Sequence, residues 1–343
     1  MKKLFHTLGP GFLVFVLLLL AACGSTSSTG GSTPTSSTGG NLNIVFLPKQ
    51  INNPYFDTAA SGGQQASKDL SGQFKQVGPS SANAAAQVPF ITTLTEQHVG
   101  AIAISGDDPN AVAPSLKQAM AQGVKVVSYD ADVAPDARNV FINQANSEQI
   151  GRSEVDLLGQ QIHSTGQIAI LSAASTAANQ NAWIGFMKDE LAAKYPNMKL
   201  VKIAYGNDDD QTSFNDTLAL LQQFPNLKGI ISPTTVGIAA AARALESVHK
   251  GGQVALTGLG TPNQLRKYVK DGTIKGFELW NPANLGYLAY YVAALLVEGK
   301  IKGTVGETFT AGKLGSYTIA ASNVVLLGPP TVFNSSNIDQ FKF

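Results

Sequence analysis

Short apolar runs alternate with longer stretches of helical periodicity from residue 43 onward. The apolar, β-branched runs predict strands at 44–47, 74–77, 101–104, 125–128, 167–171, 200–204, 229–232, 254–257 and 275–279. The stretches between them predict helices at 54–70, 84–97, 110–122, 147–162, 181–194, 211–223, 236–248, 263–270 and 285–297. Runs that are apolar throughout, such as 168–171, are typical of parallel strands covered by helices on both faces. The pattern therefore predicts an α/β fold.

The number of these strand–helix units exceeds what one sheet comfortably holds, so we expect two doubly wound parallel-sheet lobes. We place the first lobe at 41–144 plus about 281–308, and the second at 145–280 plus about 309–343. Chain crossings near 143–147 and 280–283, with a tail that returns between the lobes, would make a multi-strand hinge.

The N-terminal segment has the features of a targeting signal. Met1-Lys2-Lys3 precedes an apolar run at 11–20, which is too short for a spanning helix. The following Leu20-Ala21-Ala22-Cys23-Gly24 resembles the bacterial lipobox, in which the cysteine is lipidated and becomes the new N-terminus. We therefore predict a lipoprotein signal peptide at 1–22 and, at 23–40, the lipidated cysteine with a Ser/Thr/Gly tether. The domain would be extracytoplasmic and anchored to the cell membrane through Cys23.

Composition narrows the classes of function. The 343 residues carry a net charge of +1 with scattered lysines and arginines, which argues against a nucleic-acid-binding face. A single cysteine excludes an intrachain disulfide framework and a cysteine-rich metal site.

Polar and aromatic residues follow the predicted strands. Ligands of open α/β sheets bind just beyond the carboxyl ends of the strands, so these residues are candidates for a binding site. We predict ligand contacts from Lys49, Asn53, Tyr55, Phe56, Asp130, Asp132, Asn179, Gln180, Pro233, Thr235, Trp280 and Asn281. Each could instead be a cap, a turn or a core residue; Lys49 could be solvated and Asp130 could belong to a turn. Trp183 is interpreted as core, and Asp208-Asp209-Asp210 as an acidic cluster at a helix N-terminus.

An ammonium, carboxylates, side-chain amides and aromatic faces together are suited to a sugar, whose hydroxyls donate and accept and whose C–H face is apolar. No G-x-S-x-G elbow, P-loop or G-x-G-x-x-G motif is present, and the histidines outside the signal, His98, His163 and His249, lie in or beside helical stretches. We therefore predict a binding protein without catalysis, cofactor or metal.

Six segments carry a resemblance to a known family: 46–49, 129–132, 179–183, 233–237, 257–263 and 326–330. With the lipobox and the strand–helix rhythm, they resemble type I periplasmic binding proteins of the ribose-binding class. The branch they are most similar to holds the rhamnose-binding and autoinducer-2-binding proteins. The resemblance implies a Venus-flytrap fold, a small-sugar ligand and ABC permease subunits as partners, with the protein itself a monomer.

In autoinducer-2 binders the ligand is held by a lysine and an aspartate that match Lys49 and Asp130. Those proteins have an aspartate where Asn179 stands, and an alanine where Thr235 stands. These departures favour a rhamnose-type deoxyhexose over autoinducer-2. Autoinducer-2 uptake and a sugar sensor feeding a membrane receptor remain the alternatives. A repressor of the same fold would need an N-terminal helix-turn-helix where this chain has its lipobox.

Overall fold

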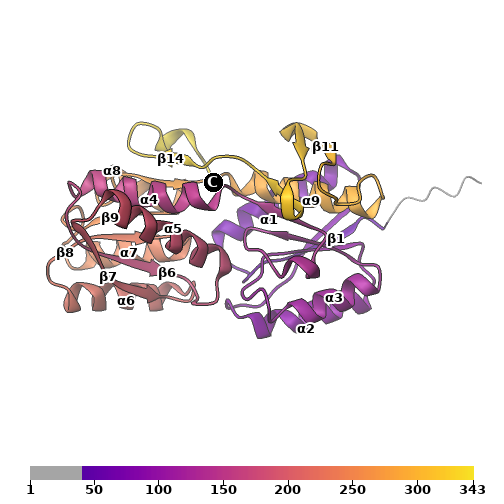
Figure 1. Cartoon of the computed structure of the whole chain (residues 1–343), viewed down its shortest axis with the longest axis horizontal. Helices are drawn as coiled ribbons and strands as arrows, with labels where there is room; N and C mark the ends of the chain where they lie inside the picture. The colour runs from indigo at the N-terminus through magenta and orange to yellow at the C-terminus, as the bar shows by residue number, and fades with distance from the viewer. Residues whose placement is uncertain (1–40) are drawn as a thin grey trace, which may run out of the picture. The chain divides into compact units, whose positions relative to one another are not determined.

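Strands and helices alternate through residues 41–343, the part of the chain that the computed structural model describes. The predicted signal peptide, Cys23 and tether lie outside the described residues. All nine predicted apolar runs form strands, and the structure adds strands at 140–143, 308–310, 316–318, 324–326 and 331–333 that the pattern did not predict. Figure 1 shows this alternation along the chain.

The first lobe is built on a six-stranded sheet in the order β13-β5-β4-β3-β1-β2, in which every pairing is parallel. Its strands are β1 (Asn43–Leu47), β2 (Gln73–Gln76), β3 (Ala101–Ile104), β4 (Lys125–Tyr129), β5 (Val140–Asn143) and β13 (Val324–Leu326). Its helices are α1 (Pro54–Asp69), α2 (Ala84–Glu96), α3 (Ala113–Ala121) and α9 (Pro282–Val297). The central strands β1, β3 and β4 are buried except for the first residue of β1 and of β4, as expected for a sheet covered on both faces.

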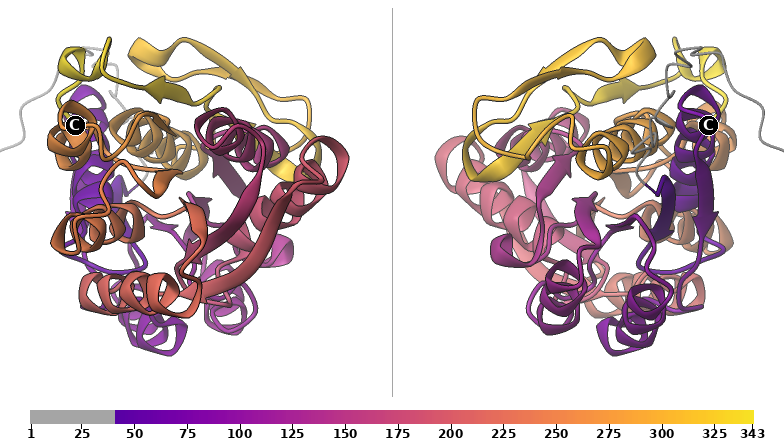
Figure 2. Two further views of the ribbon diagram at one scale, coloured as in Figure 1. Left: turned by 90° about the vertical axis from the view of Figure 1, so that its left-hand side faces the viewer. Right: turned by 90° about the vertical axis from the view of Figure 1, so that its right-hand side faces the viewer.

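The second lobe holds a four-stranded parallel sheet in the order β7-β6-β8-β9. Its strands are β6 (Gly166–Ser172), β7 (Met198–Tyr205), β8 (Leu227–Ser232) and β9 (Ala255–Gly258). Its helices are α4 (Ser147–Gln161), α5 (Ala178–Lys194), α6 (Asp210–Gln223), α7 (Thr235–Ser247) and α8 (Pro262–Lys270). Figure 2 shows these helices on both sides of the sheet. Both sheets are thus of the doubly wound α/β type that the sequence predicts.

The C-terminal tail departs from the predicted lobe assignment. β11 (Thr308–Thr310) and β12 (Ser316–Thr318) form a hairpin, and β13 then joins the first sheet beside β5. β14 (Thr331–Phe333) returns to the second lobe and pairs antiparallel with β10 (Phe277–Leu279), and the last residues stay there, where the Asn263 backbone N–H donates to the Phe343 carbonyl oxygen at 2.9 Å. The prediction that all of 309–343 belongs to the second lobe is therefore wrong for β13, because its apolar Val325 is buried against the first sheet. The chain crosses between the lobes at 144–146, 280–281 and 327–330.

Two glycines fix α9 against α1 and so position the strand end that precedes α9. A Cβ atom at Gly62 would lie 1.7 Å from the Ala283 carbonyl oxygen, and one at Gly286 would lie 1.8 Å from the Ala59 carbonyl oxygen. Any larger residue would push the two helices apart. The N-terminus of α9 is capped by Asn281, whose side chain accepts from the backbone N–H groups of Ala283 and Asn284.

Candidate functional site

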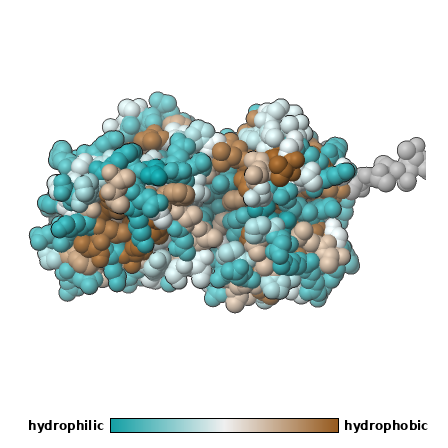
Figure 3. All heavy atoms as spheres, viewed as in Figure 1, coloured by the Kyte–Doolittle hydropathy of each residue, from teal (hydrophilic) through white to brown (hydrophobic). Residues whose placement is uncertain are grey.

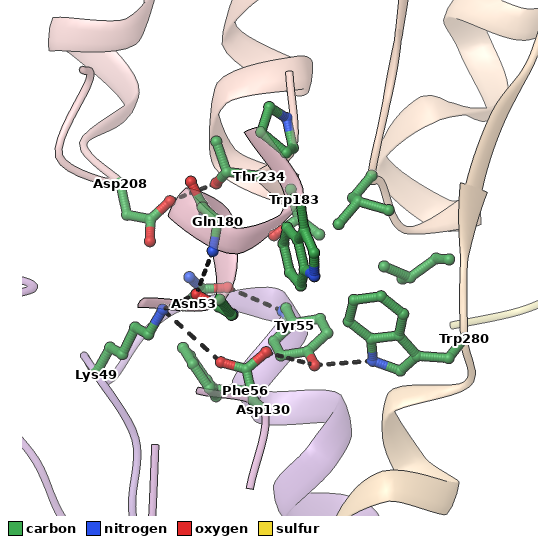
Figure 4. A pocket seen from close by; sticks show the side chains of 15 residues that line it. Lys49, Asn53, Tyr55, Phe56, Asp130, Gln180, Trp183, Asp208, Thr234 and Trp280 are labelled. Atoms are coloured by element: carbon green, nitrogen blue, oxygen red, sulfur yellow. Dashed lines mark hydrogen bonds and ion pairs between the residues drawn. The ribbon is translucent and has the colours of Figure 1, made fainter. Parts of the chain in front are cut away.

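One pocket lies at the carboxyl ends of strands from both lobes. It is a narrow pocket that both polar and aromatic side chains line. It is lined by Lys49, Asn53, Tyr55, Phe56, Asp130, Asn179, Gln180, Trp183, Asp208, Pro233, Thr234, Thr235, Leu259, Leu279 and Trp280. Figure 4 shows these side chains converging from both lobes.

The first lobe contributes a buried cation and a buried carboxylate. Lys49 follows β1 and is 4% exposed, and Asp130 follows β4. The Lys49 ammonium lies 3.9 Å from Asp130 Oδ2. Asp130 has φ 64°, a left-handed conformation that aspartate tolerates better than most residues. This backbone turn, directly after the strand, directs the carboxylate into the pocket.

Both oxygens of Asp130 are held in place by protein donors. Tyr55 Oη donates to Oδ1 at 3.0 Å, and Ser105 Oγ donates to Oδ2 at 2.7 Å. The Tyr55 hydroxyl in turn accepts from Trp280 Nε1 at 2.9 Å. Burial, and then the Asp130 charge, raise the pKa of Tyr55 well above its usual value, so it stays a donor. Tyr55 therefore orients Asp130, and its hydroxyl group already donates one hydrogen bond and accepts another within the protein.

The second lobe contributes amides. Gln180 Oε1 accepts from Ser172 Oγ at 2.6 Å and from the Ala173 backbone N–H at 2.7 Å. None of the hydrogen bonds within residues 41–343 uses the Gln180 amide nitrogen, which remains available as a donor to a ligand. Asn179 Oδ1 accepts from the Lys49 ammonium of the first lobe at 3.4 Å.

Asp208 adds a second carboxylate to the pocket. It follows β7 with φ 49°, and Thr234 Oγ1 donates to its Oδ1. Burial raises its pKa, while the Lys49 charge partly offsets that shift. Its neighbours have separate roles, since Asp209 caps α6 and Asp210 pairs with Arg243 at 2.7 Å.

A third carboxyl, Asp107, lies near the same charges without lining the pocket. Burial raises its pKa to about 7, against the lowering effect of Lys49. Its Oδ2 is buried and has no partner among residues 41–343. One ammonium thus faces an excess of carboxyls, which disfavours an anionic ligand and suits a neutral one rich in hydroxyl groups.

Contacts between the lobes surround the pocket. Gln50 Nε2 of the first lobe donates to the Asp208 carbonyl oxygen at 3.0 Å. Thr176 Oγ1 of the second lobe donates to the Asp107 carbonyl oxygen at 3.2 Å. With the Lys49–Asn179 contact, these bonds hold both sets of strand ends against the same pocket.

The other side of the pocket is apolar. Leu259, Leu279, Trp183 and Trp280 are each at most 3% exposed, and the two indole rings lie 6.1 Å apart between centroids. In Figure 4 Trp183 and Trp280 lie on the side of the pocket away from Lys49 and Asp208. A ligand that fills the pocket would therefore need one polar edge and one apolar end.

The structure brings together all the predicted contact residues except Asp132 and Asn281. Asp132 instead accepts from Arg138 Nε at 2.6 Å and from Ser128 Oγ at 2.6 Å, and Asn281 caps α9. Sequence reasoning missed Trp183, Asp208, Thr234, Leu259 and Leu279. Asp208 carries a signal for the pocket, because it follows the predicted strand 200–204, but the sequence also fits the acidic cluster at a helix N-terminus that we predicted.

No group of three or more potential metal-ligating side chains is present within residues 41–343. In the same part of the chain, no helix combines the length and apolarity required to cross a bilayer. The face drawn in Figure 3 is mostly hydrophilic, with separate apolar areas over both lobes.

Comparisons with known proteins agree with this geometry. The family model described as "Periplasmic binding protein domain" matches residues 44–301. A sugar ABC transporter protein of Actinomyces odontolyticus is 48% identical, with 88% of this chain and 97% of that chain covered and a TM-score of 0.70.

Two further solved structures are similar over most of the chain. An ABC transporter solute-binding protein of Clostridium phytofermentas with bound L-rhamnose is 38% identical, with 87% and 97% covered and a TM-score of 0.84. The LsrB protein of Clostridium saccharobutylicum in complex with AI-2 is 25% identical, with 88% and 99% covered and a TM-score of 0.84.

Proposed function

This chain belongs to the periplasmic binding protein family, among the extracytoplasmic sugar-binding proteins of ABC transporters, and from this premise we propose that its ligand is a rhamnose-type deoxyhexose. Proteins of this kind are binding proteins and not enzymes. The sugar would be held between the two lobes and delivered to the permease subunits by the monomeric binding protein.

The observation that carries this proposal is the two-sided pocket. Its polar side offers an ammonium, carboxylates and amides, which can pair with sugar hydroxyls as donors or acceptors. Its apolar side, Leu259, Leu279, Trp183 and Trp280, would face the ring C–H groups and the methyl group of a 6-deoxy sugar. Because residues of both lobes line the pocket, a ligand there favours the closed arrangement over an open one.

A matched series of sugars tests the apolar side. L-Rhamnose carries a methyl group at C5, L-mannose carries a hydroxymethyl group there, and L-lyxose carries only hydrogen. We expect L-rhamnose to bind about tenfold or more tightly than either of the others, because one missing methyl group or one added hydroxyl in an apolar pocket has effects of this order. Isothermal titration calorimetry measures the three dissociation constants.

Autoinducer-2 and D-ribose complete the panel. Tighter binding of autoinducer-2 than of every sugar would favour the alternative function, autoinducer-2 uptake. The similarity to LsrB supports this alternative. A chain that binds none of these compounds would refute the proposed function. Equal binding of L-rhamnose and L-mannose would refute only the methyl-binding role of the apolar side.

Attachment to the membrane through Cys23 is a second part of the proposal. Cys23 follows the apolar run and two alanines, and it lies outside the described residues. Lipidation would keep the binding lobes near the permease on the outer face of the cell membrane. The mass of the N-terminal peptide from membrane-extracted protein tests it, since an unmodified peptide that begins before Cys23 would contradict the anchor.

A further inference from the structure

Trp183 presents a buried polar atom that the protein leaves without a partner. Its side chain comes from α5, lines the pocket and is 2% exposed. Among residues 41–343, no acceptor lies within hydrogen-bonding reach of its Nε1. In Figure 4 the ring stands between the polar group and Trp280, with its nitrogen on the edge that faces Trp280.

The other tryptophan of the pocket, Trp280, has a hydrogen-bond partner for its indole N–H group. Trp280 Nε1 donates to Tyr55 Oη at 2.9 Å, so its N–H group is used by the protein itself. Buried donors are almost always paired, and an unpaired one is a feature that calls for a partner outside the chain. For Trp183 that partner must be an acceptor, because an indole N–H group can only donate.

The surroundings of Trp183 limit which acceptor it can meet. The charged groups, Lys49, Asp130 and Asp208, lie on the opposite polar side. The ring of Trp183 lies 6.1 Å from that of Trp280 between centroids, and Leu259 and Leu279 share its pocket lining and its buried cluster; none of these three side chains offers an acceptor. A ligand oxygen that only accepts and sits next to an apolar group suits this position. In a 6-deoxypyranose, the ring oxygen is bonded to C5, which carries the methyl group.

We propose that Trp183 Nε1 donates a hydrogen bond to the ring oxygen of the bound sugar, and that Trp183 is thereby a specificity-determining residue. The proposal rests on the proposed function, because it assumes a pyranose in the pocket. It assigns a ligand contact to a helix residue that sequence analysis interprets as core. It also fixes the orientation of the sugar, with its hydroxyl groups toward Lys49 and Asp130 and its C5 substituent toward Leu259 and Leu279.

The test combines a change in the protein with a matched change in the ligand. Trp183→Phe keeps an aromatic ring and removes the N–H group, and the 5a-carba analogue of L-rhamnose replaces the ring oxygen by a methylene group. We expect each change alone to weaken binding about tenfold or more. The dissociation constant of the variant for the analogue should be at most about threefold higher than that measured with either change alone, since both changes remove the same hydrogen bond. Calorimetry of the four combinations measures this.

The stability of the ligand-free protein separates a ligand contact from a structural role. Trp183→Phe removes a donor that the protein does not use, so its ligand-free melting temperature should stay within about 3 °C of wild type. Trp280→Phe removes a donor that Tyr55 does use, and should lower that temperature more.

Each outcome decides the proposal. Full L-rhamnose affinity in Trp183→Phe, or independent and additive losses in the four combinations, would overturn it. The carba analogue tests the contact on wild-type protein, so equal binding of L-rhamnose and its carba analogue overturns the proposal even if the variant fails to fold. Wild-type protein that does not bind L-rhamnose at all would instead refute the proposed function on which it rests.

Discussion

Replacing Asp130 by asparagine should weaken L-rhamnose binding at least a hundredfold while leaving the protein folded. Tyr55 and Ser105 each donate to one oxygen of the carboxylate. In asparagine one of these oxygens is replaced by an NH₂ group, which is itself a donor and cannot accept from the Tyr55 or Ser105 hydroxyl that faces it. Hydrogen bonds to charged groups are worth roughly 1.5–3 kcal/mol each, so the loss of two ligand bonds corresponds to about 3–6 kcal/mol. Asparagine also tolerates the left-handed backbone at this position, which alanine would strain.

The matched control for Asp130→Asn lies two residues away. Asp132→Asn changes the same chemical group, but Asp132 pairs with Arg138 and does not line the pocket. It should lower the melting temperature and leave the dissociation constant within about twofold of wild type. Calorimetry and thermal melts of both variants measure the two effects. Equal losses of binding in the two variants would show that the loop, and not the Asp130 carboxylate, is responsible.

Replacing Glu278 by glutamine should make the protein more stable above pH 7 and flatten its pH dependence. Glu278 lies in β10, two residues before Trp280, and is 1% exposed. Burial raises its pKa to about 7 from an ordinary value of 4.5. Ser153 Oγ donates to it at 2.6 Å, which offsets part of that shift.

A second buried carboxyl lies close enough to interact with Glu278. Glu154 on α4 is 0% exposed, and its oxygens have no hydrogen-bond partner among residues 41–343. Burial, and then the charge of Glu278, raise the pKa of Glu154 well above its usual value. No lysine or arginine of the described residues forms an ion pair with either carboxyl, so burial disfavours the charged form of both.

The sign of the effect follows from the direction of the pKa shift. Between about pH 4.5 and pH 7 the folded protein holds a proton on Glu278 that the unfolded chain has lost. The stabilising contribution is therefore complete below pH 4.5 and is lost as the pH rises through 7. A shift of this size corresponds to about 3 kcal/mol in the free energy of unfolding. Glutamine keeps the acceptor for Ser153 and carries no charge at any pH.

Urea unfolding at pH 5, 6, 7 and 8 measures the free energy of unfolding for wild type, Glu278→Gln and Glu96→Gln. Glu96 lies exposed on α2, so its replacement controls for the removal of one surface charge. Wild type and Glu96→Gln should lose stability together as the pH rises, and Glu278→Gln should lose less. Parallel curves for all three proteins would contradict the role given to Glu278.

Much of the site could be predicted because parallel sheets place their ligands at strand ends. Reading the residues that follow apolar runs predicts Lys49, Asp130 and Asn179, which line one pocket in the structure; their contact with a ligand stays a prediction. Asp132 was a wrong candidate because its side chain turns to Arg138, a pairing that the spacing along the chain does not reveal. Asn281 was wrong because a cap and a ligand contact call for the same residue type at the same place.

The residues that sequence reasoning missed have a common cause. Trp183 is a buried helix residue, which agrees with its interpretation as core. It also forms part of the pocket wall, which that interpretation did not include. Asp208 is one of three consecutive aspartates, and only its left-handed backbone directs it inward while the next two cap α6 and pair with Arg243. Packing between residues far apart in the sequence places both side chains in the pocket. Neither hydrophobic periodicity nor residue propensity predicts such packing.

The fold was predictable to the extent that its strands are apolar and its helices periodic. The tail was not, because β13 is only three residues long and is held by pairing with β5 of the first sheet, which lies far away in the sequence. Short edge strands of this kind depend on their partner more than on their own composition.

The crystal structure of the protein grown with L-rhamnose tests the central claim most directly. The account predicts one sugar in the pocket, with hydroxyl groups on Lys49 and Asp130 of the first lobe and on Asn179 or Asp208 of the second. Its C5 methyl group should lie toward Leu259 and Leu279. A sugar bound outside this pocket, or one that contacts residues of a single lobe, would contradict it.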